Sequence, residues 1–560
     1  AIALPYTRKR IKLAFRCRHQ AKNWKRLSTG LLKWPCRMCK LTSPPQILKT
    51  MGRSNLLRII LLAASLVAAG FVCGQSGNRV TDRDNVRVWW SSELLPGSVR
   101  WFTDPPKDVE IRYRLTPQKE IGWTSCSSGD GILFNIDTTR SYQSVLGIGT
   151  SLEATSLYAL MKNKNEKQIR DLIRVILDPE KGMGLNLFRI TIGTSDFSDG
   201  RKYSIHPKGF YTYQDKEDVP FSIQPDIDFG IIKILKLFVD EAASLNQEIK
   251  FFASEWSPPQ WMKTSENIIG GSLKTGYEKM MAIYFRKFIE AYEKEGIPIY
   301  AITIQNEPNF TPDSYPGMRL SPEQEKNIAI AVFEEFNDTA SGKRHIGTRI
   351  WINDHNMNHW VNADKVLNYL KDMGKEQTVD GVAFHNYNPM ASPSNMSKLK
   401  KLHPDKDIHL TEHSEWGVSG MYNIQDYFLN WSRSYCYWVP MTTIKLDEHN
   451  QGPYNNLSEL SPPLFIERGT DTTNMDVTPE FYLLSQFSKF IRPGAYRIEC
   501  NPGSGKTITS VVFRNRDNTI VQILVNQTKA EQKFMTVVGS HCFTGVLPAG
   551  TVGTYKWENN

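Results

Sequence analysis

The chain has 560 residues, of which 40% are hydrophobic. This length is too great for one ordinary hydrophobic core, so we predict a large domain plus a smaller one, or a barrel with insertions. Its net charge of +10 would suggest a nucleic acid or another acidic partner, but 15 of the 68 Lys and Arg residues, and none of the 58 Asp and Glu residues, lie in residues 1–74. The rest of the chain carries a net charge of −5, which removes the main support for nucleic-acid binding.

The segment that begins at Met51 predicts a secretory signal peptide. Arg53 and Arg58 precede an apolar run over residues 59–72, and small residues follow it. Because a helix needs about 20 apolar residues to span a bilayer, a retained membrane anchor is the less favoured interpretation. We therefore assign 51–74 to the signal peptide and 1–50 to upstream sequence or an untypical extension, and we expect a secreted or lysosomal protein.

The cysteines and the glycosylation sequons beyond residue 74 agree with the secretory pathway. Cys500 and Cys542 both fall in the C-terminal part and are candidates for a disulfide, but together with Cys126 and Cys436 they allow three connectivities. The sequence also has six Asn-x-Ser/Thr sequons, at Asn309, Asn337, Asn395, Asn430, Asn456 and Asn526. We expect several of these asparagines to be glycosylated.

Residues 75–140 and 488–560 are predicted to be rich in short strands. Runs such as "VRVWW" (86–90) and "ITSVVFRN" (508–515) are joined by Gly, Pro, Asn and Asp turns and show no helical period. We expect the two segments to form one β-sandwich built from both ends of the chain.

Residues 141–487 alternate between strand-like runs and segments of helical period. The helical period is clear for Ile231, Leu235 and Phe238, and again for Met281 and Phe285. Eight apolar runs end in polar or aromatic residues, at 144–153, 186–198, 249–259, 301–308, 349–356, 381–389, 408–416 and 441–450. This order predicts a (β/α)8 TIM barrel, in which active-site residues follow the C-terminal ends of the strands.

Two glutamates at such strand ends predict a glycosidase. Glu307, in "QNEP", follows the fourth run, and Glu412, in "LTEHS", follows the seventh. Hydrolysis of a glycosidic bond needs one carboxyl group to protonate the leaving oxygen and a second to attack or to activate water, and a separation of about 5–5.5 Å gives a retaining double displacement. We predict Glu307 as the acid/base and Glu412 as the nucleophile, with Asn306 donating a hydrogen bond to the sugar 2-hydroxyl group.

Other interpretations of these carboxyl groups remain open. A glutamate at a strand end is commonly a solvated or helix-capping residue, and Glu415, Asp447 and Glu448 lie close enough in the sequence to compete for the catalytic roles. A degenerate barrel that only binds carbohydrate would be expected to lack one of the two catalytic carboxyl groups, and both are present here.

Several motifs together resemble glycoside hydrolase family 30 of clan A, whose animal members include lysosomal glucosylceramidase. The resemblance covers about residues 80–557 and is carried, in this order, by "FRITIGTSDFS", "ASEWSPPQWMKT", "QNEP", "FHNY", "LTEHS" and "FYLLSQFSKFIRPGAYRI". It implies a barrel with a side β-sandwich, retention of configuration, and no metal or organic cofactor. It also implies Glu307 as acid/base, Asn306 as its companion and Glu412 as nucleophile.

The resemblance implies further substrate-binding or supporting residues. Arg189 matches an arginine that hydrogen-bonds the nucleophile, where its charge would keep Glu412 ionised, although a surface salt bridge is the alternative. His385 and Tyr387 match a pair at the end of the sixth strand, where the tyrosine hydroxyl could orient the nucleophile. Trp256 would form a wall for the sugar or pack in the core, and Glu153 lies near an acid that binds glucose hydroxyl groups.

Departures from the glucosylceramidase pattern leave the substrate open. Where glucosylceramidases have Trp-Asn after the eighth strand, this chain has Ile444 and Lys445, and Asn386 stands where they have tryptophan. We predict a retaining β-glycosidase that is glucosylceramidase-like, with peripheral membrane contact if the substrate is a lipid. The alternatives are a β-glycosidase acting on β-1,6-glucan, β-xylosides or β-fucosides, and a catalytically silent carbohydrate-binding protein.

Overall fold

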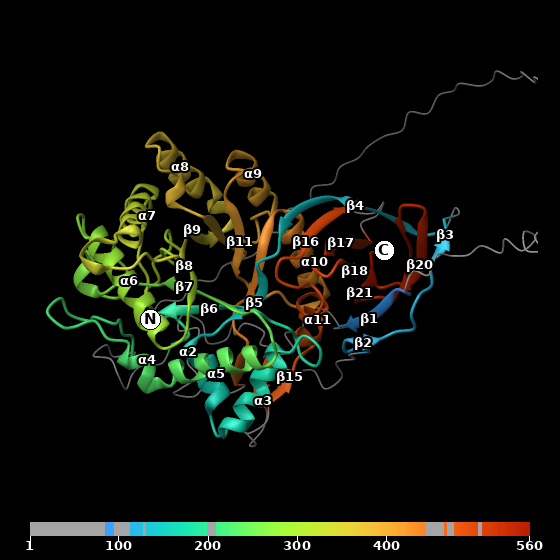
Figure 1. Ribbon diagram of the computed structural model, residues 1–560, viewed down its shortest axis with the longest axis horizontal. Coiled ribbons are helices and arrows are strands. Elements are labelled where there is room, and N and C mark those ends of the chain that lie inside the picture. The colour runs from blue at the N-terminus through green and yellow to red at the C-terminus, as the bar shows by residue number, and fades with distance from the viewer. Residues whose placement is uncertain are drawn as a thin grey trace, which may run out of the picture. The chain divides into compact units, whose positions relative to one another are not determined.

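The computed structural model describes residues 85–93, 112–126, 130–198, 209–443, 464–467, 475–501 and 507–559. A closed barrel of eight parallel strands forms its centre, and the helices that follow the strands surround it (Figure 1). The predicted signal peptide, the extension before it, and Ile444, Lys445, Asp447 and Glu448 lie outside the described residues. The predicted TIM barrel is confirmed.

Seven of the eight barrel strands overlap the predicted runs. The barrel strands are β5 (Gly147–Ser151), β6 (Leu187–Ile192), β7 (Lys250–Glu255), β8 (Ile299–Thr303), β9 (Arg349–Asn356), β10 (Gly381–His385), β11 (Asp407–Glu412) and β12 (Ser432–Tyr437). The eighth prediction, 441–450, is wrong: β12 closes the barrel against β5, and β13 (Met441–Thr443) pairs outside it with β14 (Phe465–Glu467), next to β15 (Met475–Val477). The sequence "SRSYCY" of β12 is less apolar than "MTTIKL", which is why the pattern favoured the wrong segment.

The barrel interior has an apolar layer beneath a polar layer. Leu187, Phe252, Ala301, Trp351 and Ala383 form a buried cluster with Cys436, and the Trp351 ring centre lies 5.3 Å from that of Phe252. Because side chains alternate along a strand, the inward positions two residues further on form the next layer. That layer contains Arg189, Ser254, Thr303 and His385. The polar side chains therefore lie directly above the apolar layer, toward the C-terminal ends of the strands.

The helices around the barrel bury their apolar faces. They are α2 (Ala154–Met161), α3 (Glu166–Leu177), α4 (Gln224–Phe229), α5 (Ile231–Ser244), α6 (Glu278–Lys294), α7 (Pro322–Asn337), α8 (Trp360–Asp372), α9 (Ser394–Leu402), α10 (Gly417–Leu429) and α11 (Pro479–Ser488). Helix α7 begins with a capping box in which Ser321 and Gln324 each satisfy the other's backbone N–H. The predicted helical runs at Ile231 and Met281 are α5 and α6.

Both ends of the described chain form one ten-stranded sheet that folds into the predicted sandwich. Its order is β2-β1-β21-β18-β17-β16-β4-β19-β20-β3. The bounds are β1 (Arg87–Ser92), β2 (Thr116–Pro117), β3 (Thr124–Ser125), β4 (Ile132–Ser144), β16 (Tyr496–Cys500), β17 (Ile508–Arg514), β18 (Thr519–Asn526), β19 (Gln532–Val538), β20 (His541–Leu547) and β21 (Thr551–Glu558). The long strand β4 pairs with β19 in its first part and with β16 in its second, which joins the two layers.

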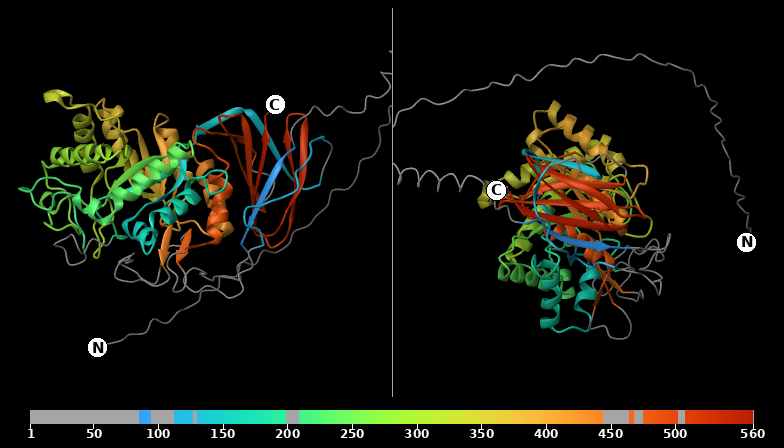
Figure 2. Two further views of the ribbon diagram at one scale, coloured as in Figure 1. Left: turned by 60° about the horizontal axis from the view of Figure 1, so that its bottom comes forward. Right: turned by 90° about the vertical axis from the view of Figure 1, so that its right-hand side faces the viewer.

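Helices α10 and α11 connect the barrel to the sandwich (Figures 1 and 2). The Gln425 side chain of α10 donates to the carbonyl of Ile523 at 2.8 Å and accepts from Thr509 at 2.6 Å. From α11, Gln486 donates to the Ser91 hydroxyl of β1 at 2.7 Å. The two domains are therefore joined by buried, hydrogen-bonded contacts.

The described cysteines and one sequon differ from expectation. Cys126, Cys436, Cys500 and Cys542 are all free, so the suggested Cys500–Cys542 disulfide is absent. Asn526 is fully buried in β18, and its amide group donates to the carbonyls of Ala530, Leu547 and Pro548. Since those bonds leave no room for a glycan, Asn526 is not a glycosylation site in this fold.

Within the described ranges, no helix combines the length and the apolar character needed to cross a membrane.

Candidate active site

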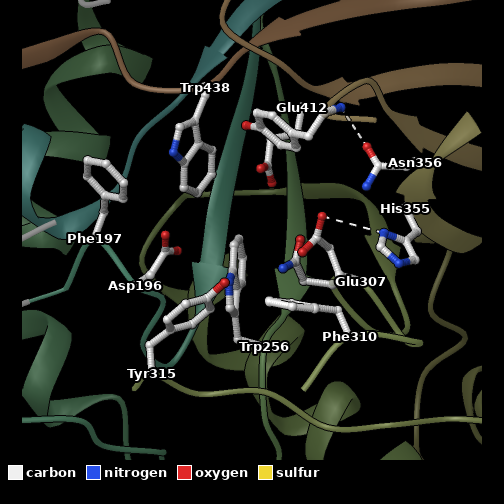
Figure 3. A pocket seen from close by; sticks show the side chains of 12 residues that line it. Asp196, Phe197, Trp256, Glu307, Phe310, Tyr315, His355, Asn356, Glu412 and Trp438 are labelled. Atoms are coloured by element: carbon white, nitrogen blue, oxygen red, sulfur yellow. Dashed lines mark hydrogen bonds and ion pairs between the residues drawn. The ribbon is translucent and has the colours of Figure 1, made fainter. Parts of the chain in front are cut away.

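A cavity of about 340 Å³ opens where the barrel strands end (Figure 3). Its volume falls within the range of about 300–1,000 Å³ that is usual for small-molecule sites. It is lined by residues from the ends of the barrel strands and from the loops that follow them: Asp196, Phe197, Trp256, Asn306, Glu307, Phe310, Tyr315, His355, Asn356, Tyr387, Glu412 and Trp438. The two predicted catalytic glutamates therefore line the same cavity.

Arg189 fixes the predicted nucleophile from beneath. Its guanidinium group is fully buried and donates to Glu412 through Nη1 and to Asn306 Oδ1 through Nη2, the latter at 2.8 Å. Burial opposes the charge of Arg189, but the carboxylates of Asp354 and Glu412 hold its pKa above the ordinary value. The sequence expectation of a hydrogen bond from Arg189 to Glu412 is confirmed, and the alternative of a surface salt bridge is excluded.

Asp354 is one of the residues that the sequence interpretation missed. It is fully buried and accepts from Arg189 Nη2 at 2.9 Å, from Thr303 at 2.6 Å and from Thr411 at 2.6 Å. Burial alone would raise the pKa of Asp354, but Arg189 and His385 lower it far below the ordinary value, so the carboxylate is ionised. Asp354 is thus the counter-ion that lets two cations lie beneath the cavity.

The backbone around Glu307 is strained. Glu307 has φ of 49°, and its N–H donates to the carbonyl of Asp354, which itself has φ of 38°. Asn353 also has positive φ, at 74°, beside a register shift between β9 and β10. Such conformations are costly for residues other than glycine and concentrate at functional sites. The strain turns the side chain of Glu307 into the cavity and that of Asp354 beneath it.

One imidazole ring contacts both predicted catalytic carboxylates. His385 Nδ1 lies 3.3 Å from Glu307 Oε1, and His385 Nε2 lies 3.6 Å from Glu412 Oε2 and 3.1 Å from Asp354 Oδ1. Burial lowers the pKa of His385, but the surrounding carboxylates outweigh it and raise the pKa to about 10. His385 is therefore a cation that spans the distance between Glu307 and Glu412.

Glu307 has a second histidine beside it. His355 Nδ1 lies 3.5 Å from Glu307 Oε1 (Figure 3). The His355 ring also stacks on that of His359, with 4.0 Å between the ring centres. Burial would raise the pKa of Glu307, but His355 and His385 outweigh it and hold the pKa well below the usual range. Without a bound substrate, Glu307 is thus ionised.

Tyr387 and Asn306 complete the surroundings of Glu412 and Glu307. The Tyr387 hydroxyl hydrogen-bonds Glu412; burial and that carboxylate raise the pKa of Tyr387 well above its usual value, so the hydroxyl keeps its proton. The backbone N–H of Tyr387 donates to Asn356 Oδ1 at 2.6 Å, which holds the loop after β10. Because Asn306 Oδ1 already accepts from Arg189, its amide N–H groups are the part left for a ligand.

Glu153 does not line the cavity, which corrects the expectation that it binds substrate. It is fully buried, and it accepts from the hydroxyl groups of Ser151 and Thr191, both at 2.6 Å, and from Ser195. Asp196 lines the cavity in its place. Burial and then the nearby carboxylates raise the pKa of Asp196 well above the usual value, which favours the protonated carboxyl group, the form that can donate a hydrogen bond.

Trp256 and Trp438 form an aromatic wall. Trp256 is only 2% exposed, and its ring stacks on that of Trp438 at 6.0 Å and on the Arg189 guanidinium at 4.6 Å. Both interpretations of Trp256 therefore hold, since it packs against Arg189 and lines the cavity. Trp438 was missed because the eighth strand was placed one segment too late.

The competing glutamate Glu415 lies apart from this cavity. It is 3% exposed, accepts from Asn423 at 2.9 Å, and pairs with His413 at 3.0 Å. Across the described ranges, no cluster of three or more His, Cys, Asp or Glu side chains is arranged to hold a metal ion.

Comparison with known proteins agrees with this geometry. The model of the "Glycosyl hydrolase family 30 TIM-barrel domain" matches residues 145–491, and that of the "Glycosyl hydrolase family 30 beta sandwich domain" matches residues 494–555. Together these matches span the barrel and the C-terminal strands of the sandwich.

Individual relatives fall into two groups by name. "Putative glucosylceramidase 2" of Caenorhabditis elegans is 28% identical over 458 residues, which cover 78% of this chain and 83% of the relative. "Endo-1,6-beta-D-glucanase neg1" of Aspergillus fumigatus is 27% identical over 449 residues, covering 75% and 86%. The solved structure of "The endo-beta1,6-glucanase BT3312" has a TM-score of 0.69 at 23% identity and covers 85% of this chain and all of that one, so it shares the fold.

Proposed function

This chain belongs to glycosyl hydrolase family 30 and is a glycosidase, and from that premise we propose that it hydrolyses β-glucosidic bonds by double displacement with retention of configuration. The observation that carries the proposal is the arrangement of Glu307 and Glu412, which line one cavity and are bridged by the His385 ring. In this scheme Glu412 attacks the anomeric carbon and Glu307 handles the proton of the leaving oxygen.

The surroundings of Glu412 suit a nucleophile. Arg189 and Tyr387 donate to the carboxylate, and His385 adds a positive charge 3.6 Å away. These donors hold the carboxylate in one orientation for attack. Once the glycosyl–enzyme bond forms, the charge of Glu412 is lost, so one of the carboxylates that raise the pKa of His385 disappears.

The surroundings of Glu307 suit a group that alternates between acid and base. His385 carries a proton within hydrogen-bond reach of Glu307, with 3.3 Å between Nδ1 and Oε1. In the first step Glu307 must be protonated and give its proton to the leaving oxygen, and in the second step its ionised form takes a proton from water. The low pKa of Glu307 favours the ionised form that the second step needs. The protonated form that the first step needs is favoured only in acidic solution.

The charge balance of the site favours a cationic transition state. Arg189 and His385 carry positive charge against the carboxylates of Asp354, Glu307 and Glu412, which leaves one net negative charge beneath the cavity. An oxocarbenium-like transition state gains positive charge at the anomeric centre. Fixed negative charge in a buried site stabilises it without reorganisation.

The sugar would lie between Asp196 and the two glutamates. Asp196 and Phe197 lie across the cavity from Glu307 and His355 (Figure 3), so a protonated Asp196 would donate to hydroxyl groups far from the anomeric carbon. Asn306 would donate to the 2-hydroxyl group, where the bond strengthens in the transition state. The Trp256 and Trp438 rings supply an apolar face for the sugar.

Two substrate classes are compatible with this site. Relatives named as glucosylceramidases and as endo-1,6-glucanases match at similar identity, so glucosylceramide and β-1,6-glucan are both candidates, the first with peripheral membrane contact. The predicted signal peptide supports a secreted or lysosomal enzyme, and the low pKa of Glu307 supports work in an acidic compartment.

The direct test follows turnover and stereochemistry together. Residues 75–560, produced in a glycosylating host, are incubated at acidic pH with an aryl β-glucoside, glucosylceramide and a β-1,6-glucan. Proton NMR then follows the first anomer released. We expect β-glucose from the aryl glucoside. α-Glucose as the first product would overturn the double displacement, and no reaction with any β-glucoside, β-xyloside or β-fucoside would overturn the catalytic proposal.

A second measurement tests the role of His355 through pH. Because the pKa of Glu307 is lowered, its acid form exists only below that pKa, and kcat/KM for a glycoside with a poor leaving group falls as pH rises. His355→Leu removes one of the two histidines that lower this pKa, so the alkaline limb should move to higher pH. A 2,4-dinitrophenyl glucoside, which needs no proton donor, serves as the control and should show no such movement. An unmoved alkaline limb would exclude His355 from tuning Glu307.

A further inference from the structure

A second cavity, of about 440 Å³, adjoins the first at the same end of the barrel. Tyr387 lines both cavities. The second cavity lies between the loop after β10, residues 386–393, and the segment after β11, residues 413–426, which includes the start of α10. Neither the catalytic scheme nor the sequence motifs give this cavity a role.

Its lining combines aromatic surfaces with hydrogen-bonding groups. Tyr387 and Trp416 are 41% and 38% exposed, and both line this one cavity, so they present two aromatic surfaces to the same space. Asn386 and Asn388 from one side, and Asn423 and Asp426 from the other, bring amide and carboxyl groups to the same space. Aromatic faces flanked by amides match the apolar faces and equatorial hydroxyl groups of a hexose ring.

Glu415 makes this lining rigid. The buried carboxylate accepts from Asn423 at 2.9 Å and from the hydroxyl of Tyr427, which in turn accepts from Asn386 at 2.6 Å. Burial would raise the pKa of Glu415, but His413 and these donors lower it, so it holds both sides of the cavity as an ion. His413 also packs its ring on Tyr387, with 4.8 Å between the centres. Because these side chains are already held in place, little conformational entropy is lost when a ligand binds.

The second cavity lies toward the leaving-group side. Glu307 must reach the leaving oxygen, and Asp196 closes the far side of the first cavity (Figure 3). His385 contacts Glu307 and lies 6.1 Å, centre to centre, from the ring of Tyr387, beyond which the second cavity begins. A leaving group that departs past Glu307 would therefore pass Tyr387 before it reaches Trp416.

We propose that the second cavity is a leaving-group subsite that binds a hexosyl unit of a β-linked glycan, which makes a polysaccharide or oligosaccharide the preferred substrate. The inference rests on the proposed function, since it assumes that the bond is cleaved between Glu307 and Glu412. The alkyl chains of a lipid would bury the amides of Asn386, Asn388 and Asn423 against hydrocarbon, at a cost that a sugar avoids. Trp416 and Tyr387 are the platforms on which the sugar ring stacks.

The test compares substrates of increasing length. For the unaltered protein, kcat/KM is measured with an aryl β-glucoside and with β-1,6-linked glucose oligomers of two to five units. We expect kcat/KM to rise with length until the second cavity is filled. Trp416→Ala should lower kcat/KM about tenfold on the longer oligomers and leave the aryl glucoside unchanged, because only the oligomers reach the cavity.

Two further variants separate this subsite from a general effect on the fold. Ser419→Trp adds bulk at an exposed position in the lining and should produce the same selective loss without removing a native contact. Tyr422→Ala removes an equally exposed aromatic ring of α10 that lines neither cavity, and it should behave as the unaltered protein.

Each outcome decides the proposal. Loss on oligomers alone supports it. Equal loss on oligomers and aryl glucoside, or no loss with either lining variant, overturns it while the catalytic scheme stands. Selective loss of glucosylceramide turnover with oligomers unaffected also overturns it, because the cavity would then receive the lipid. Binding of a β-1,6-linked pentamer to Glu412→Gln, measured calorimetrically with and without Trp416→Ala, gives a readout independent of turnover, and an unchanged Kd would count against the subsite.

Discussion

Glu412→Gly is expected to lower kcat by at least about 10⁴-fold, because it removes the atom that attacks the anomeric carbon. The cavity left by the side chain is lined by Arg189 and His385, so it presents positive charge to a small anion. Added azide should therefore enter it and attack the same face of the sugar, forming the α-glycosyl azide from an aryl β-glucoside. The measurement is release of the aryl group with and without azide, followed by NMR of the sugar product.

The stereochemistry of that product distinguishes the roles of the two carboxylates. A β-glycosyl azide would mean that azide had attacked from the opposite face, and Glu412 would then not be the nucleophile. Full activity of the variant would eliminate Glu412 outright. Glu415→Gly serves as the comparison, because it removes a buried carboxylate three residues away that lines the second cavity and not the first; azide should not rescue it.

Glu307→Gln is expected to reduce turnover of glycosides with poor leaving groups by roughly 10³-fold, whereas an aryl glycoside with a good leaving group should still glycosylate the enzyme. Glutamine keeps the size of the side chain but cannot supply or accept the proton. Since the second step also needs Glu307 as a base, the glycosyl–enzyme should accumulate. The measurement is a pre-steady-state burst of dinitrophenolate, together with the mass of the intact protein.

Two results would contradict the acid/base assignment. One is an equal loss on both kinds of glycoside, which would point to damaged geometry. The other is the absence of a burst, which would place the slow step before glycosylation. A matched variant, Glu325→Gln, alters another buried carboxyl group near Asn353 outside the cavity and should leave the ratio between the two substrates unchanged.

The sequence predicted the strands that carry the catalytic groups because those strands have the clearest pattern. The runs "AITI" and "IHL" are short and apolar, Glu307 and Glu412 follow them within three residues, and both runs lie in buried strands of the barrel. The eighth strand was misplaced because β12 contains Ser432, Arg433 and Ser434, while the nearby β13 resembles a buried strand and belongs to a small separate sheet.

The supporting charges could be predicted only in part. Arg189 was found through the motif around it, but nothing in "RIWINDHN" marks Asp354 as the partner of two cations. That role depends on positive φ at Asn353 and Asp354 and on the register shift between β9 and β10, which are properties of the folded backbone. Likewise, Glu153 and Asp196 both follow barrel strands, and only the surrounding hydroxyl groups decide that the first is enclosed and the second lines the cavity.

The pairing of β1 with β21 has a consequence for the order in which the protein assembles. One edge of β1 pairs with the nearby β2, but on the other edge Val88 pairs with Tyr555 of β21, so that edge has no partner until translation is nearly complete. The barrel strands are made in between and pair mostly with the next strand along the chain, so they can associate as they emerge. Until β21 arrives, this edge of β1 is open, and an open strand edge exposes the nascent chain to aggregation for most of its synthesis.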